Sequence, residues 1–323
     1  MAALSVGVEL IGDGLDESVF DPSQPRRGVA PLARRLEAAG VTYWVIGAER
    51  GEPTDPTTVA LDPSVLATVA ARHTAELGLV VAAAPHRDHP YNLARRLVSV
   101  DHAARGRVGW LALDFDHAIG LNAASDTWTG AVPDPVHTAH AVNAVRTLWR
   151  TWPLASIVGD RATGMFADVN QIRRADVRNG YAITGPLNVP GSRQGDLPVW
   201  RLDAGDDTSS SSNGADLVIV EAGARIPAGV PVVVRVRSTE SIAATLDRLA
   251  GTSGVVGVIL RLDPDAVDDV LDVVLPAAHR RGLLQSPHGD TLRARLDLPP
   301  LAAPEMSGHA LAFDGAPNPG GRL

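Results

Sequence analysis

The sequence predicts an α/β fold, a (β/α)₈ (TIM) barrel, from three observations. Short β-branched runs alternate with amphipathic segments rich in Ala, Leu and Arg, which is the pattern of parallel strands joined by crossover helices. Eight such runs occur, and several are continuously apolar, as expected for strands that are covered on both faces. The length of 323 residues suits one large barrel. Eight strands in one chain favour a closed barrel over an open sheet.

The predicted strands follow one another along the whole chain. In order, they are Leu4–Leu10, Thr42–Ile46, Leu77–Ala82, Val108–Leu113, Leu197–Leu202, Asp216–Val220, Pro231–Val236 and Val255–Leu260. The helices predicted between them are Ala30–Ala39, Pro63–Thr74, Tyr91–Ala104, Val136–Trp152 and a last one that begins at Asp263-Pro264. Asp62-Pro63 and Asp263-Pro264 each place an N-cap residue before a proline at the first helical position.

Connections in the second half of the chain are short. Residues 203–215 separate the fifth and sixth strands, and residues 221–230 separate the sixth and seventh. A parallel crossover normally needs a dozen or more residues, so neither link has room for a full helix. Residues 238–254, after the seventh strand, hold one modest helix. The sequence therefore predicts shortened connections after strands 5, 6 and 7.

The domain organisation expected from this pattern is a single domain over residues 1–323. Residues 156–196 contain weak strand-like pieces and many turn residues, so we expect an excursion on the barrel. The serine run within residues 203–214 predicts a flexible, solvated loop.

Composition argues against several classes of function. The net charge is −8 and no Lys/Arg-rich block occurs, so nucleic acid is an unsuitable partner. The absence of cysteine excludes disulfides and thiolate metal sites. No apolar run approaches the roughly 18 residues of a membrane span, and the N-terminus has no basic region or cleavage pattern. We expect a soluble, cytoplasmic protein.

Three long stretches carry a family resemblance, namely His89–Trp110, Gly159–Val199 and Val274–Pro299, with a weaker match at Leu32–Glu49. On these stretches the chain resembles the bacterial luciferase-like, flavin-dependent monooxygenases, in the branch that contains nitrilotriacetate monooxygenase. The resemblance implies a barrel that receives reduced FMN from a separate flavin reductase and oxidises a small organic substrate. It also implies a homodimer, or a heterodimer with a related barrel. A deazaflavin is a weaker alternative for the cofactor.

The ends of the strands depart from that family's pattern. At the third strand, where the family offers hydroxyls, this chain has Val81–Pro85 with none. At the fourth strand, where the family offers an amide and hydroxyls, Trp110 is followed by Leu-Ala-Leu-Asp-Phe. At the fifth strand the expected phosphate position holds Asp203, Asp206 and Asp207. Carboxylates repel a phosphate, so the flavin site is predicted to be degenerate.

Polar residues that remain near the predicted mouth supply the candidate site. The catalytic candidates are Glu49, His86, Asp114 and His117, because functional groups of such barrels follow the carboxyl ends of the strands. By resemblance and position, the candidates for cofactor contact are Glu49, Trp110, Asp114 and Gly205. A metal site at His86, Asp116 and His117 has no supporting spacing, so no metal is predicted.

Three functions therefore stay open from the sequence. The first is an FMN-dependent monooxygenase, which the resemblance favours. The second is a catalytically silent barrel that acts as a subunit or binding protein, which the degenerate strand ends favour. The third is a flavin-free enzyme that uses Glu49, Asp114 or His117, and it requires these side chains to converge on one pocket.

Overall fold

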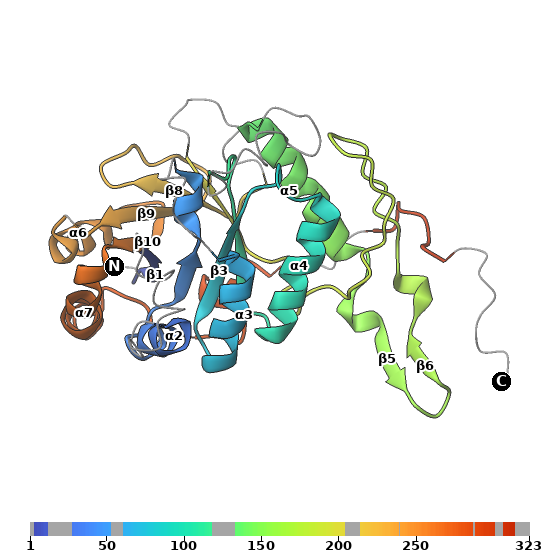
Figure 1. Ribbon diagram of the computed structural model, residues 1–323, viewed down its shortest axis with the longest axis horizontal. Helices are drawn as coiled ribbons and strands as arrows, with labels where there is room; N and C mark the ends of the chain where they lie inside the picture. Colours follow the sequence, from blue (N-terminus) through green and yellow to red (C-terminus); the bar gives the residue numbers. More distant parts are fainter. Residues whose placement is uncertain are drawn as a thin grey trace.

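The computed structural model describes residues 3–11, 28–52, 61–117, 133–203, 214–238, 240–286, 288–300 and 306–313. Within these residues the chain forms a closed barrel of eight parallel strands surrounded by helices (Figure 1). The strands of the barrel are β1 (Ser5–Leu10), β2 (Tyr43–Ile46), β3 (Gly78–Ala83), β4 (Val108–Ala112), β7 (Val199–Leu202), β8 (Leu217–Glu221), β9 (Val232–Arg237) and β10 (Val255–Leu262). Each predicted strand overlaps one of these, so the predicted barrel is confirmed.

One helix follows each of the first four barrel strands, one follows β9, and three short helices follow the last strand, β10. They are α2 (Val29–Ala38), α3 (Pro63–His73), α4 (Pro90–Ala103) and α5 (Pro135–Arg150), followed by α6 (Ile242–Leu249), α7 (Val267–Asp269), α8 (Leu275–Arg280) and α9 (Leu292–Arg295). Shorter 3₁₀ turns are η1 (Ala48–Gly51), η2 (Leu154–Ser156), η3 (Val169–Gln171) and η4 (Pro264–Ala266), and a π turn, η5 (Val270–Val274), joins α7 to α8.

Helix starts follow the predicted capping chemistry at one aspartate and depart from it at another. Asp62 accepts a hydrogen bond from the backbone N–H of Ser64 at 2.8 Å, which caps α3 as predicted. Asp263 has no capping bond, and its carboxylate accepts from the hydroxyl of Ser238 at 2.5 Å instead. Asp263 therefore occupies the predicted N-cap position before Pro264, but its carboxylate bonds to Ser238 and not to the first turn.

Connections after the later strands are short, as predicted. Residues 222–231, between β8 and β9, contain turns and bends without a helix, and residues 238–254 contain only α6. Residues 204–213 of the predicted serine-rich loop lie outside the described residues. No helix in the described part of the chain is both long and apolar enough to cross a membrane.

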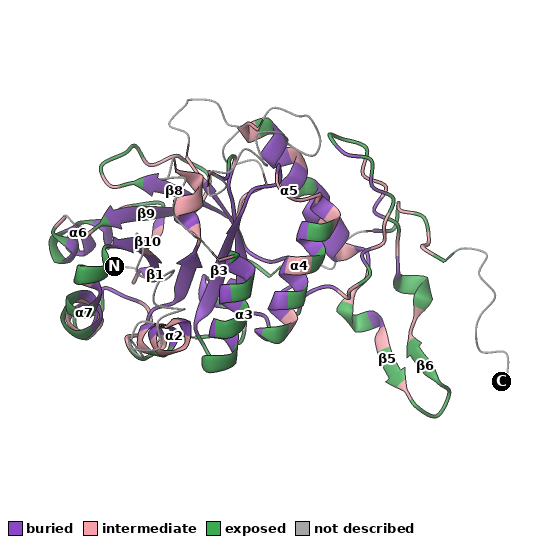
Figure 2. Ribbon diagram, in the orientation of Figure 1, coloured by how far each residue is buried: buried purple, intermediate pink, exposed green. Residues whose placement is uncertain are grey.

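An excursion lies between α5 and β7. It contains a two-stranded antiparallel hairpin, β5 (Ile157–Asp160) and β6 (Met165–Ala167), which extends away from the barrel (Figure 1). Figure 2 shows the hairpin mostly exposed, whereas the barrel strands are buried. The excursion returns to the barrel through a buried network in which Ser192 and Gln194 donate to the carboxylate of Asp101.

The barrel interior is tightly packed below its mouth. Tyr43 and Trp200 point inward with ring centroids 5.3 Å apart, and both rings are fully buried. They fit because Gly7 and Gly109 have no side chains: a Cβ on Gly109 would lie 2.4 Å from the Trp200 ring. Leu292 of α9 joins the same interior cluster and helps to fill it.

Candidate functional site

Five charged side chains gather at the mouth, where barrels of this kind carry their functional groups. Glu9 of β1 pairs in register with Arg261 of β10, and Glu221 of β8 pairs in register with Arg235 of β9. Arg261 lies two positions beyond the inward-facing Ile259, so its side chain also faces inward, above the packed interior. Arg235 pairs in register with Ile259 and faces inward as well. Because register partners point to the same face of a sheet, Glu9 and Glu221 also face inward. The fifth member, Glu52, follows η1. We call Glu9, Glu52, Glu221, Arg235 and Arg261 the mouth network.

The mouth network is held by several ion pairs. Arg261 donates to both carboxylate oxygens of Glu52, through Nη1 and, at 2.8 Å, through Nη2. Arg235 donates to Glu221 through Nη2 and, at 2.7 Å, through Nε. Glu9 contacts both arginines, with its oxygens 3.3 Å from Arg261 Nε and 3.7 Å from Arg235 Nη1. Each guanidinium therefore contacts at least two carboxylates, and the network closes on itself.

Burial decides the electrostatics of this network. Burial raises the pKa of Glu9 above its usual value, although the two neighbouring arginines oppose that shift. The hydrogen bonds from Arg261 lower the pKa of Glu52, whose side chain is 38% exposed. Arg237, two positions beyond Arg235 in β9, also acts on Glu52 and lowers its pKa, so three arginines lie near the three carboxylates. Glu9 Oε1 has no hydrogen-bond partner among the described residues, and its charge is compensated by the ion pair with Arg261 Nε at 3.3 Å.

A second cluster lies at the rim, after β3 and β4. Asp116 accepts from Arg50 Nε at 3.1 Å and from Arg50 Nη2 at 2.8 Å. The backbone N–H of Asp116 donates to His86 Nε2 at 2.8 Å, so His86 is neutral and carries its proton on Nδ1. Burial, helped by the charge of Arg87, lowers the pKa of His86 from 6.5 to about 4. His86 therefore supports the backbone of this loop.

The aromatic ring of Phe115 joins two of the predicted catalytic residues. It stacks on His86, with ring centroids 4.8 Å apart, and lies 4.4 Å from the ring of His117. The backbone N–H of His117 donates to the carbonyl of Arg50 at 2.7 Å, which ties the loop after β4 to η1. Glu49, also in η1, is half-buried. The structure thus brings His86 and His117 onto one part of the rim.

The side chain of Asp114 does not join the contacts of His86 and His117. It accepts from Arg201 Nη2 at 2.7 Å, and Arg201 also donates to the carbonyl of Pro135 at the start of α5. Since Arg201 follows the inward-facing Trp200 in β7, this pair lies on the outer side of the barrel. Asp114 and His117 therefore belong to separate sets of contacts, which contradicts the convergence that a flavin-free enzyme using both would need.

Trp110 was predicted to touch a cofactor, and the structure places it in the core. Its ring is fully buried, packs edge-on against Trp149 of α5, and donates its indole N–H to the carbonyl of Ala83 at 3.0 Å. The prediction is wrong because Trp110 occupies an outward position of β4. Gly205, the remaining candidate, lies outside the described residues. No group of three metal-binding side chains is found among the described residues.

The described strand ends do not fit a flavin ring. A protein holds an isoalloxazine by hydrogen bonds to its polar edge and tunes it by nearby charge. Inward-facing residues at the ends of β3 and β4 are Ala82, Ala84 and Leu113, which belong to the apolar interior and offer no side-chain donor or acceptor. On the opposite side, the charged side chains of the mouth network are already paired with one another. The apolar ends of β3 and β4 were predicted from the sequence, whereas the mouth network was not.

One signal could have revealed the mouth network from the sequence. Glu9, Arg235 and Arg261 interrupt strands that are otherwise apolar, at SVGVEL, VVVRVR and VVGVILRL. A charged residue inside such a strand is costly unless a partner lies beside it. Only the order of the strands shows that these partners belong to β1, β8, β9 and β10.

Comparison with known proteins identifies related chains. The model of the luciferase-like monooxygenase family matches residues 12–177, just over half of the chain. Dibenzothiophene-sulfone monooxygenase of Rhodococcus erythropolis is 34% identical over 146 residues, covering 43% of this chain and 31% of that protein. A pristinamycin IIA synthase subunit of Streptomyces pristinaespiralis is 31% identical over 136 residues, covering 42% and 43%. Nitrilotriacetate monooxygenase component A of Aminobacter aminovorans is 28% identical over 137 residues, covering 42% of this chain and 30% of that protein.

Solved structures with the same fold extend the likeness to nearly the whole chain. EDTA monooxygenase from Chelativorans sp. BNC1 superposes with a TM-score of 0.71 at 18% identity, covering 93% of this chain and 100% of that chain. Long-chain alkane monooxygenase gives a TM-score of 0.71 at 14% identity, covering 92% and 96%. At these identities the likeness shows the fold. The matched sequences span only about a third to two fifths of the length of the curated relatives.

Proposed function

This chain belongs to the luciferase-like monooxygenase family, and we propose that within this family it is a barrel without flavin chemistry of its own, acting as a subunit or binding protein. The mouth network is the observation that supports the proposal. A flavin ring at this mouth would have to lie against charges that are already paired, and the apolar ends of β3 and β4 offer its polar edge no side-chain partner among the residues described there.

The role of a subunit has support among the relatives. The pristinamycin IIA synthase relative is itself named as a subunit, which makes it one part of a larger synthase. We propose that the partner of this chain is a second luciferase-like barrel, which supplies the flavin site. Soluble, cytoplasmic placement and dimer formation are parts of the same proposal.

A flavin titration tests the proposal directly. Purified chain is titrated with FMN, and with reduced FMN under anaerobic conditions, while flavin fluorescence and protein circular dichroism are followed. We expect no saturable binding at micromolar flavin by a folded protein, and no flavin-dependent oxygen uptake when a flavin reductase and NADH are supplied. A luciferase-like enzyme that binds FMN serves as the positive control. Saturable micromolar binding, or oxygen uptake that depends on the chain, would overturn the proposal.

A second candidate is an FMN-dependent monooxygenase acting on a small organic substrate. The family match favours it, and so do Arg235 and Arg261, because a cation near the flavin ring stabilises the negative charge of its reduced form. A Glu52→Gln variant separates the two candidates. If flavin binds at the mouth, this variant changes the flavin affinity, whereas Asp160→Asn in the exposed hairpin leaves it unchanged.

A further inference from the structure

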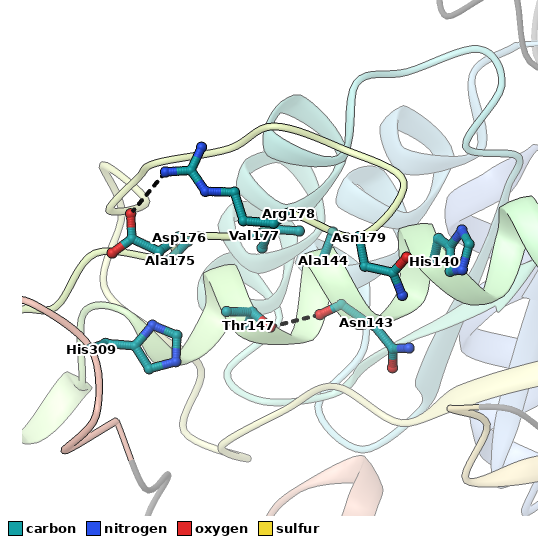
Figure 3. A pocket seen from close by; sticks show the side chains of 10 residues that line it. All are labelled: His140, Asn143, Ala144, Thr147, Ala175, Asp176, Val177, Arg178, Asn179 and His309. Carbon is teal, nitrogen blue, oxygen red and sulfur yellow. Dashed lines mark hydrogen bonds and ion pairs between the residues drawn. The ribbon is translucent and has the colours of Figure 1, made fainter.

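A surface groove lies outside the barrel, between α5, residues 175–179 of the excursion and His309 (Figure 3). Its volume is about 220 Å³, which suits a ligand smaller than most cofactors. Ala144 and Val177 give it an apolar floor, and polar side chains line both ends. Neither the mouth network nor the rim cluster takes part in it, so the groove can bind a ligand whether or not the barrel binds flavin.

The walls of the groove are held by specific contacts. Val177 and Ile183 form an antiparallel bridge, and the backbone N–H of Ala175 donates to the carbonyl of Thr184 at 2.7 Å. Gly180 has φ +72°, and a Cβ at this position would lie 2.7 Å from His140 Nδ1, so only glycine lets the turn pack against α5. The groove is therefore a shaped feature of the excursion.

Several polar groups in the groove have unused bonding capacity. The side chains of His140, Asn143 and Asn179 make no hydrogen bond within the described part of the chain. His309 Nδ1 lies 3.0 Å from the carbonyl of Arg174, which can only accept, so this nitrogen carries the proton and Nε2 is left as an acceptor in the neutral ring. Polar groups in this state are available to a ligand.

The charged pair at one end is the most informative feature. Arg178 Nη2 and Asp176 Oδ1 are 4.0 Å apart, beyond hydrogen-bond distance, so each keeps its capacity to bind (Figure 3). Asp176 has φ +46°, which is uncommon for a residue with a side chain and holds its carboxylate at this end. A ligand that was only anionic would be repelled by Asp176, and one that was only cationic would be repelled by Arg178.

We propose that this groove binds a small zwitterion of the α-amino acid class. Its ammonium group donates to the Asp176 carboxylate, while its carboxylate accepts from the Arg178 guanidinium. The two charges of an α-amino acid are separated by a single carbon atom, which matches the short separation of Asp176 and Arg178.

Calorimetric titration of the full chain tests this assignment. The probes are small L-α-amino acids, together with N-acetyl-L-alanine, which lacks the ammonium group, and L-alaninamide, which lacks the carboxylate. We expect saturable binding of at least one free amino acid, and binding at least tenfold weaker when either charge is blocked. If no free amino acid binds to the folded protein, or if both blocked forms bind equally well, the proposal is wrong.

Substitutions in the groove and in the hairpin test where the amino acid binds. Asp176→Asn and Arg178→Gln should each weaken binding at least tenfold, whereas Arg161→Gln at the tip of the exposed hairpin should leave it unchanged. Since Arg178 is 71% exposed, its replacement keeps the test valid even if Asp176→Asn folds poorly. Binding that survives Arg178→Gln without loss would overturn the assignment. The flavin titration above does not depend on either variant, so the two proposals fail separately.

Discussion

The barrel mouth and the outer groove are both polar, but they use their polar groups in opposite ways. At the mouth, each of Arg235 and Arg261 contacts at least two carboxylates, and both guanidinium groups are buried. In the groove, Asp176 and Arg178 stand 4.0 Å apart on the surface. The place where the fold normally holds its chemistry is thus closed by internal pairing, while an added segment carries polar groups that remain available.

The largest expected effect comes from breaking the mouth network. Arg261→Met should lower the free energy of unfolding by about 3–5 kcal/mol, because it leaves the buried Glu9 carboxylate with only the more distant Arg235, at 3.7 Å. Urea unfolding followed by circular dichroism measures the loss. Arg161→Met, in the exposed hairpin, is the matched control and should change stability by less than about 0.5 kcal/mol. A loss below about 1 kcal/mol at Arg261 would show that the network contributes little.

A pH-dependent effect is expected at the rim. The folded-state pKa of His86 is lowered to about 4, so the folded protein binds fewer protons than the unfolded chain between pH 4 and pH 6.5. Its contribution to stability is therefore complete above pH 6.5 and is lost as the pH falls towards 4, by at most about 3 kcal/mol. His86→Gln retains an acceptor for the N–H of Asp116 and does not titrate. Unfolding curves over this range should fall more steeply for the original chain; parallel curves would contradict the assignment.

A smaller effect is expected from a mouth residue that water reaches. Glu52→Gln removes a charge that Arg261 pairs with, but this side chain is 38% exposed, so solvent screens the interaction. We expect a loss of about 1 kcal/mol in the free energy of unfolding. A double-mutant cycle with Arg261→Met isolates the coupling between the two residues. A coupling close to zero would mean that Glu52 lies at the mouth without stabilising it.

The smallest effect is expected in the groove. Arg178→Gln should change the free energy of unfolding by less than about 0.5 kcal/mol, because its side chain is exposed and its ion pair is long. The same variant is expected to lose ligand binding, so stability and binding are measured on one protein. A substantial loss of stability would mean that Arg178 belongs to the fold, and the contrast with the mouth would disappear.

The local sequence pattern was sufficient to predict the strands and helices, but it was not sufficient to predict which side chains form the candidate site. All eight barrel strands were found because continuous apolar runs and helical spacing are properties of neighbouring residues. Trp110 was misplaced because a strand buried on both faces shows no alternation that would tell its inward side from its outward side. Asp114 was expected at the mouth, but its partner Arg201 lies 87 residues further along the chain.

The barrel, the short later connections and the apolar ends of β3 and β4 can all be derived from the sequence, since each depends on a local run of residues. What fills the mouth and what lines the groove depend instead on how the chain packs in three dimensions. Glu9 and Arg261 meet because the barrel closes β1 onto β10, and His309 meets α5 because the chain end returns past the excursion. Such contacts follow from closure and packing, which join residues that no local pattern connects.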